Sequence, residues 1–385
     1  MAILVVNAGS TTIKYKLFSK DLTEILSGVL DKTDNDVEST LKKDGSKYEW
    51  VVNQEVFQSP ASTILNEVKE HQLDFIAFRV VHGGEDFREP QLISTEVLEK
   101  LEKLNNLAPL HNPPAIRVIR DFTSSINLPM YAVFDTAYHA TMPPESYLYS
   151  IPFEFYSKHK IRKYGFHGTS HKYVHNRIKS LETRSSKIVS CHLGGGASIT
   201  AIDNGIVMDT SMGFTPLEGL TMATRSGDID AGVVMYMARE LKIPIEEINE
   251  ILNKKSGLLG ISGMTSDMRV LLQEEAAGNE RAHQAIETYI YDVRRYIGSY
   301  IALLGGIDVL AFTAGIGQGS DVIRTRVCAN LENFGIILDE TINTGKINVS
   351  EDLKISLPAS VPVWVIATNE EWQIATEARD LFSSR

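Results

Sequence analysis

Two turns rich in glycine and small hydroxyl residues interrupt apolar, β-like runs of this chain. The first lies within residues 3–14, ILVVNAGSTTIK, and the second within residues 188–200, IVSCHLGGGASIT. A hairpin tip with almost no side chains lets backbone N–H groups point at an anion. One such turn is ordinary, but two of them about half of the 385 residues apart predict two related domains that face one polyphosphate across a cleft.

Charged residues close to apolar runs are the next candidates for chemistry. Arg225 lies in residues 210–228, a long stretch without helix or strand periodicity, and its guanidinium suits a phosphoryl group. Arg79 and Asp135 lie at or just after the ends of apolar runs, where α/β folds carry active-site groups. From strand position alone, each of these two is as readily structural as functional.

Three histidines, His167, His171 and His175, follow one another at a spacing of four. On a helix they would share a face, but no Glu or Cys completes a zinc site there. Gly168 to Ser170 predict a loop and a helix N-cap, which puts His167 before the helix and the other two on it. A structural role is the ordinary expectation for each histidine; the glycine-flanked turn favours His167 for function.

Residues 314–319, AGIGQG, form a predicted turn between an apolar strand and a helix that begins near Ser320. Such a turn lets a nucleotide approach the backbone at a helix N-terminus. A dinucleotide site is the alternative, because Asp339 ends a strand-like segment about 20 residues further on. That pattern needs glycine at Ser320 and more strands after this unit, so it fits the chain poorly.

The composition indicates a soluble α/β protein of two domains. The net charge of −11 argues against nucleic acid or an anionic membrane as a partner. With only Cys191 and Cys328, no disulfide framework is available, and with neither a leader nor a long apolar span we expect a cytoplasmic protein. Strands are predicted at 75–81, 131–134, 308–313 and 362–366, and helices at 94–107, 231–241, 245–252, 280–304 and 370–382.

Several longer segments resemble acetate kinase motifs, in order and from end to end. They are NAGSTTIKYKLF, FRVVHGGE, APLHNPPAI, VFDTAYHATMPP, YGFHGTSHKYV, SMGFTPLEGLTMATRSGDID, TSDMR, FTAGIG and IATNEE. The resemblance places the chain with the acetokinase family, in the superfamily of sugar kinases, heat-shock chaperones and actin. It implies duplicated RNase H-like domains with ATP in the cleft. We expect residues 1–149 with 370–385 to form one domain, and residues 150–369 to form the nucleotide-binding domain.

The resemblance also implies roles for residues. The catalytic positions are Asp135, His167 and Arg225, and the acetate pocket is Arg79, Val81, Leu110, Phe166 and Pro216, with His111 beside it. Asn7 and Glu370 would help to hold Mg²⁺, and Ser10, Thr12 and Lys14 would face the phosphates. The nucleotide loops are His192, Leu193, Gly194, Gly195 and Gly196; Asp267, Met268 and Arg269; and Gly315, Ile316, Gly317, Gln318 and Gly319.

The departures from the family pattern are uneven. The acetate-side positions all match, whereas the family usually has Asn at Gly195 and Glu-Asn at Gln318 and Gly319. Ala367 replaces a usual Pro, and Phe78 a usual His. The sequence therefore predicts weaker or less purine-selective nucleotide binding, with acetate handling unaffected, unless the loops have repacked.

The implied activity is reversible in-line phosphoryl transfer from ATP to acetate, with Mg²⁺, or Mn²⁺ in its place, in a cytoplasmic homodimer. A carboxylate is a nucleophile at pH 7 without a strong base. Asp135 is therefore expected to orient Mg²⁺ or its water, although the family assigns it an acid–base role. A propionate or other short-chain carboxylate kinase is the alternative; an actin-like ATPase gives no reason for Arg79, His167 and Arg225 to occur together.

Overall fold

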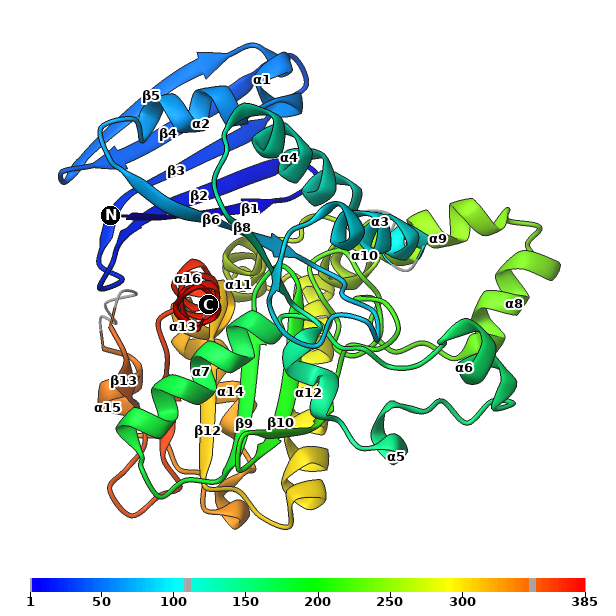
Figure 1. Cartoon of the computed structure of the whole chain (residues 1–385). Helices are drawn as coiled ribbons and strands as arrows, with labels where there is room; N and C mark the ends of the chain where they lie inside the picture. The colour runs from blue at the N-terminus through cyan, green and yellow to red at the C-terminus, as the bar shows by residue number, and fades with distance from the viewer. Residues whose placement is uncertain (1, 107, 109–111, 346–350, 385) are drawn as a thin grey trace. The chain divides into compact units, whose positions relative to one another are not determined.

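The computed structural model describes residues 2–106, 108, 112–345 and 351–384. It divides the chain into two compact units, Met1–Ala140 with Asn369–Arg385 (unit 1), and Thr141–Thr368 (unit 2). Within the described ranges, no helix is both long enough and apolar enough to cross a bilayer. Each unit is built on one mixed β-sheet with helices packed against it (Figure 1).

Unit 1 contains an eight-stranded sheet in the order β5-β4-β3-β2-β1-β6-β8-β7. Its strands are β1 (Ala2–Ala8), β2 (Thr12–Ser19), β3 (Glu24–Lys32), β4 (Val37–Lys43), β5 (Ser46–Val52), β6 (Leu73–Val80), β7 (Gln91–Leu92) and β8 (Met130–Phe134). Its helices are α1 (Gln54–Gln58), α2 (Ala61–Glu67), α3 (Thr95–Lys103), η1 (Leu104–Asn106), α4 (Asn112–Ser125) and α16 (Glu370–Ser383), and η2 (Ala137–Thr141) runs into unit 2.

The central strand β1 is covered on both faces, which explains its unbroken apolar sequence AILVV. Leu4 and Val6 belong to a core that includes residues of α1, α2 and α4. Ile3 and Val5 pack in a second cluster with Ile374, Ala375 and Ala378 of α16. Helix α16 therefore belongs to the core of unit 1.

Unit 2 contains a six-stranded sheet in the order β11-β10-β9-β12-β14-β13. Its strands are β9 (Lys187–Leu193), β10 (Ala197–Asp203), β11 (Ile206–Thr210), β12 (Val309–Thr313), β13 (Leu353–Lys354) and β14 (Val363–Val365). Its helices are α5 (Pro144–Tyr147), α6 (Glu154–His159), α7 (Gly168–Leu181), α8 (Ala231–Arg239), α9 (Ile245–Lys254), α10 (Gly257–Ser262), α11 (Met268–Ala276), α12 (Glu280–Leu304), α13 (Ala314–Gly319), α14 (Asp321–Cys328), η3 (Glu332–Phe334) and α15 (Glu340–Asn343).

The two sheets share one topology. In unit 1, β3, β2 and β1 are antiparallel neighbours, and β6 and β8 continue the sheet parallel to β1. In unit 2, β11, β10 and β9 are antiparallel in the same way, and β12 and β14 continue parallel to β9. The predicted duplication of an RNase H-like fold is confirmed, and both glycine-rich turns are hairpin tips at the same place in it.

Helices α7 and α12 cover opposite faces of the second sheet. Side chains alternate along a strand, and Ser190 of β9 bonds to His171 of α7. The next residue, Cys191, lies near Tyr289 of α12, where burial raises the pKa of the tyrosine and the thiol adds to this shift. The first face is therefore lined by hydroxyl and imidazole groups and the second by apolar ones. Helix α7 therefore packs on the polar face of the sheet, and α12 packs on its apolar face.

Candidate functional site

A bidentate ion pair between the guanidinium of Arg79 and the carboxylate of Asp135 lies at the centre of a polar cluster in unit 1. Because β1 and β8 both flank β6, Asn7 and Val133 lie beside Arg79 in register, and Asp135 follows directly after β8. Nε of Arg79 lies 3.1 and 3.0 Å from the two carboxylate oxygens of Asp135, and its Nη2 also bonds to that carboxylate. Nη1 of Arg79 donates to Oδ1 of Asn7 at 3.1 Å. The three strand ends therefore present one connected group of charges.

Glu370 joins this cluster from the first turn of α16. Asn369 caps that helix by accepting a hydrogen bond from the backbone N–H of Trp372. Burial raises the pKa of Glu370 to about 7; the charge of Arg79 opposes this shift, whereas the charges of Asp135 and Glu371 add to it. The charge of Lys14 also opposes the shift, but burial and the neighbouring carboxylates outweigh both cations, so the negative charge of Glu370 is incompletely balanced.

The donor set of this cluster fits a hard divalent cation. Among the residues that the structure describes, no three His, Cys, Asp or Glu side chains gather closely enough to hold a metal ion by themselves. Mg²⁺ does not require that, because it usually keeps several waters and binds one or two carboxylates together with phosphate oxygens. The amide oxygen of Asn7 and the carboxylates of Asp135 and Glu370 are oxygen ligands of the kind such an ion accepts.

In unit 2, the imidazole of His167 and the guanidinium of Arg225 converge on Gly196. A Cβ built at Gly196 would lie 3.4 Å from Nε2 of His167 and 3.5 Å from Nη1 of Arg225. The imidazole of His192 stacks on that of His167 with ring centres 4.2 Å apart. Because Gly196 has no side chain, both nitrogen groups lie next to the backbone of the hairpin tip.

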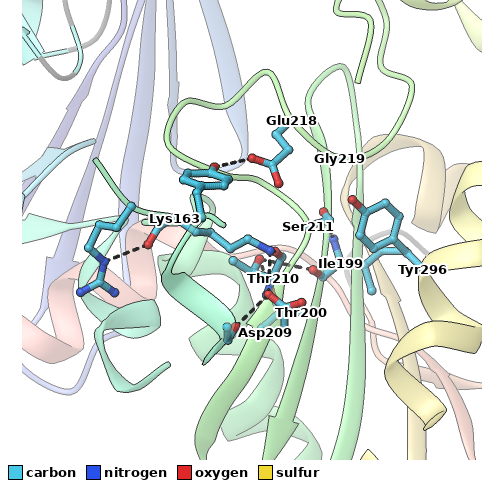
Figure 2. Close-up of polar contacts among 12 residues, drawn as sticks. Lys163, Ile199, Thr200, Asp209, Thr210, Ser211, Glu218, Gly219 and Tyr296 are labelled. Carbon is cyan, nitrogen blue, oxygen red and sulfur yellow. Dashed lines mark hydrogen bonds and ion pairs between the residues drawn. The ribbon is translucent and has the colours of Figure 1, made fainter. Parts of the chain in front are cut away.

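His167 is held just before α7 in a left-handed backbone conformation with φ of 57°, a conformation that residues other than glycine adopt at a cost. The segment before it is attached to β11 and the following loop. Lys163 donates to the Asp209 carboxylate at 2.8 Å and to the carbonyl of Thr210 at 3.0 Å (Figure 2), and the N–H of Gly165 donates to the carbonyl of Gly213. These contacts hold the strained turn in place.

The segment between β11 and α8 is irregular, as the sequence predicted for residues 210–228, and polar contacts hold it. Tyr149 donates its hydroxyl proton to Glu218 (Figure 2), and the N–H of Gly219 donates to Asp228 at 2.8 Å. The N–H of Ala223 donates to the carbonyl of Gly195, which ties this segment to the hairpin. The contacts fix the backbone that carries Arg225.

Arg225 is a half-buried cation without a carboxylate partner in the described part of the chain. Its Nη1 donates to the carbonyl of Pro216 at 3.0 Å and contacts the sulfur of Met222 at 3.6 Å. Burial lowers its pKa, and no neighbouring charge offsets this. Since buried charges in proteins are ordinarily paired, this guanidinium indicates a site for an anion.

Beside this cluster lies a cavity of about 680 Å³ that the predicted nucleotide loops line. Its walls come from the β9–β10 tip, the start of α11, helix α13 and the start of α14. The lining residues are Gly194, Gly195, Ala223, Ser266, Asp267, Met268, Arg269, Leu272, Gly315, Ile316, Gly319, Ser320, Asp321 and Val322. Residues 314–319, predicted to form a turn, instead form the short helix α13, and Ala314 at its start adopts φ of 65°.

A buried arginine that the sequence did not reveal supports helix α13. Nη1 of Arg324 donates to the carbonyls of Gly317 and Gln318 at 2.9 and 2.8 Å, and its Nε donates to Asn343. Burial lowers the pKa of Arg324 to about 10. The side chain of Gln318 turns the other way, and its Oε1 accepts from the Thr368 hydroxyl at 3.0 Å. Gln318 and Arg324 therefore fix the shape of the loop.

Gly195 has room for a side chain on the cavity wall. Nothing lies within 4 Å of a Cβ built there, and its φ is not in the left-handed region. If the nucleotide and acetate sites are those that the resemblance implies, we expect Gly195→Asn to fold normally and to lower the KM for ATP by about 3- to 10-fold, the worth of one hydrogen bond, with the KM for acetate constant. Steady-state kinetics with each substrate varied would check this, and an unchanged KM for ATP would mean that the loops already compensate locally.

The remaining predicted residues lie in several places. Thr12 donates to Asp31 at 2.7 Å, Ser10 is exposed, and Lys14 lines a separate cavity of about 380 Å³ on the sheet of unit 1. Val81 is buried in unit 1, and Phe166 is buried in unit 2. His192 and Leu193 end β9, and Gly317 packs against Leu193. Leu110 and His111 lie outside the described residues.

Comparisons with known proteins show the family to which the sequence and fold are similar. A model of the acetokinase family matches residues 2–376. An acetate kinase of Dictyoglomus thermophilum is 44% identical over 402 residues, which cover 98% of each sequence. The crystal structure of Porphyromonas gingivalis acetate kinase has a TM-score of 0.92 at 36% identity and 99% coverage of both chains. That of a propionate kinase from Francisella tularensis has a TM-score of 0.91 at 39% identity and 98% coverage of both.

Proposed function

The chain belongs to the acetokinase family, and we propose that it transfers the γ-phosphoryl group of ATP reversibly to acetate, giving acetyl phosphate and ADP. It is a phosphotransferase with a carboxyl group as the acceptor. The observation that carries the proposal to particular residues is the partly buried guanidinium of Arg225. It lies beside His167 and a side-chain-free hairpin tip, and no carboxylate in the described residues pairs with it.

The chemistry needs charge stabilisation more than it needs a base. An oxygen of acetate attacks the γ-phosphorus while the bond from phosphorus to the ADP oxygen breaks, so no proton is transferred. The nucleophile is ionised already, since the pKa of a carboxylic acid is about 4. Negative charge on the equatorial oxygens must be stabilised during the transfer. Arg225 and an N–H of His167 are the donors that we assign to those oxygens.

The cluster of unit 1 supplies the complementary half of the chemistry. We assign Arg79 to the carboxylate of acetate, and its fork onto Asp135 fixes the direction of the guanidinium. An acetate carboxylate within reach of Nη1 of Arg79 would compete for that donor with Oδ1 of Asn7, which accepts from it at 3.1 Å. In this assignment Asp135 orients and does not abstract a proton, because its oxygens already accept hydrogen bonds from Arg79.

We assign the divalent cation site to Asn7, Asp135 and Glu370, directly or through water. Bound Mg²⁺, or Mn²⁺ in its place, would neutralise the β- and γ-phosphates of ATP. The support is the incompletely balanced carboxylate of Glu370 among three oxygen-bearing side chains. The chain's own contribution is to hold those oxygens at neighbouring strand ends and at the start of α16.

Glu370→Gln should raise the Mg²⁺ concentration for half-maximal activity about tenfold, because one carboxylate ligand is lost. The chelator EDTA should abolish turnover in the unmodified protein. Glu371→Gln is the matched control on the next residue of α16, and we expect it to change the requirement much less. Full activity in EDTA would contradict the metal assignment.

The choice of carboxylate is tested by one substrate panel. Acetate, propionate and butyrate are compared by kcat/KM with ATP held at saturation. We expect acetate to be preferred by a modest factor, since one methylene in an apolar pocket is worth only about 1–3 kcal/mol. A preference for propionate would select the alternative activity, and ATP hydrolysis that no carboxylate stimulates would point to an ATPase.

We propose further that the protein is a cytoplasmic homodimer. Support for self-association comes from α8 and its flanks, where Val233, Met235, Tyr236, Leu241 and Ile245 expose large apolar side chains. Exposed apolar surface of this kind ordinarily marks an interaction site. The molar mass in solution, measured by light scattering, distinguishes one copy from two.

A further inference from the structure

A chain of hydrogen bonds runs from His167 into the interior of unit 2. Nδ1 of His167 lies 2.9 Å from the Ser198 hydroxyl, and Nε2 of His171 lies 2.8 Å from that same hydroxyl. On its other side, Nδ1 of His171 lies 2.9 Å from the hydroxyl of Ser190. His171, Ser190 and Ser198 are all completely buried. These hydrogen bonds thus link Nδ1 of His167 to buried side chains that have no contact with solvent.

One hydroxyl hydrogen couples the two imidazoles. Ser198 has a single hydrogen, so it donates to one of the two ring nitrogens and accepts from the other. If His171 carries its hydrogen on Nε2, Ser198 donates to Nδ1 of His167, and the hydrogen of a neutral His167 is on Nε2. If His171 carries its hydrogen on Nδ1, with Ser190 as acceptor, the order is reversed and His167 is protonated on Nδ1.

The two arrangements present different groups to the hairpin tip. Nε2 of His167 is the nitrogen that faces Gly196 together with Nη1 of Arg225. In the first arrangement that nitrogen is an N–H donor; in the second, a neutral His167 presents a lone pair, which repels an anion. Only in the first arrangement do His167 and Arg225 both offer an N–H donor to a phosphoryl oxygen.

We propose that Ser190, His171 and Ser198 are positioning residues that hold neutral His167 in the Nε2–H form. The inference rests on the proposed role of His167 in phosphoryl transfer. Ser190 donates to His171, His171 to Ser198, and Ser198 to Nδ1 of His167. If His171 kept its hydrogen on Nε2 and His167 carried one on Nδ1, both imidazoles would donate to the oxygen of Ser198. The hydroxyl hydrogen of Ser198 would then have no acceptor in this buried site.

The tautomer can be read directly by nitrogen NMR on protein labelled with ¹⁵N-histidine. For the unmodified protein we expect the chemical shifts of neutral His167 to show hydrogen on Nε2. Ser198→Ala should give a mixture of both forms. A neutral His167 with its hydrogen on Nδ1 in the unmodified protein would overturn the proposal without any variant.

Kinetics provide the second readout. Ser198→Ala and His171→Asn should each lower kcat by about 10-fold or more, with both KM values within about twofold, because outer partners of a functional imidazole have effects of that size. His171→Gln can place its amide near the position of Nε2 and should restore most of kcat. Thr200→Val is the matched control. Thr200 lies on β10 with Ser198, and its buried hydroxyl pairs with that of Thr210 on β11 (Figure 2), so its loss should not change kcat.

Two further results, from the variants, would also overturn the inference, and they are distinguishable. If Ser198→Ala keeps both the tautomer and kcat while His167→Ala loses kcat, the relay is wrong and the role of His167 stands. If His167→Ala turns over like the unmodified protein, the proposed role of His167 fails and the positioning role fails with it. Circular dichroism and thermal unfolding of each variant verify that the protein measured is folded.

Discussion

Arg225→Ala will lower kcat by about 100-fold or more while leaving the fold intact. The guanidinium lies beside the hairpin tip in a preorganised loop, and removal of one such donor from a transition state costs about 10²- to 10³-fold. The lost interaction with Pro216 is a single bond to a backbone carbonyl, so the effect on stability should be small. Stopped-flow or steady-state measurement of kcat, with unfolding followed in parallel, tests both parts.

The matched control is Arg281→Ala. Arg281 also donates to backbone carbonyls, those of Gly260 and Ile261, but it is exposed and lies away from the hairpin. We expect kcat to stay near that of the unmodified protein in this variant. Arg225→Lys, which keeps the charge but loses the planar fork, should fall between the two. If Arg225→Ala retains kcat, the charge-stabilising role that we assign to it is wrong.

Arg79→Leu will affect both substrate binding and stability. It removes the cation assigned to acetate, so the KM for acetate should rise tenfold or more while the KM for ATP changes much less. It also removes the guanidinium that is paired with the carboxylate of Asp135, which is 1% exposed. Breaking a buried pair by removing one member costs about 3–5 kcal/mol. Urea unfolding and kinetics with each substrate varied separate the two effects.

The double variant Arg79→Leu with Asp135→Leu separates substrate binding from the cost of breaking a buried ion pair. Stability should recover in large part, because both members of the pair are removed together, but activity should not. If the single Arg79→Leu raises both KM values equally, the residue affects the enzyme as a whole and not the acetate site. If stability is unchanged in the single variant, the fork with Asp135 contributes little.

The parts of the fold that repeat a local pattern were predictable. The two hairpins stood out because each pairs an apolar run with a turn that has few side chains, and the helix predicted at 280–304 matches α12 because its apolar residues keep one stripe. Arg79 and Asp135 could be placed at strand ends from the ends of apolar runs. Their contact with each other could not, since it depends on strand order and not on spacing along the chain.

Contacts between residues that are far apart in the sequence could not be predicted for the same reason. Nothing in the sequence shows that Ser198 bridges two histidines or that Arg324 bonds to α13, because each contact joins elements distant along the chain. One local prediction failed as well. The strand-like segment that ends at Asp339 forms only one isolated bridge in the described part of the chain, between Leu338 and Ser356.

The position of α16 in the core of unit 1 has a consequence for biosynthesis. A ribosome makes β1 before unit 2 and α16 after it. Ile3 and Val5 therefore cannot pack against Ile374, Ala375 and Ala378 until all of unit 2 has been translated. Unit 2 is contiguous and can complete its own core first, whereas the nascent unit 1 keeps an uncovered apolar sheet face, the kind of surface that chaperones bind and that aggregates when synthesis stalls.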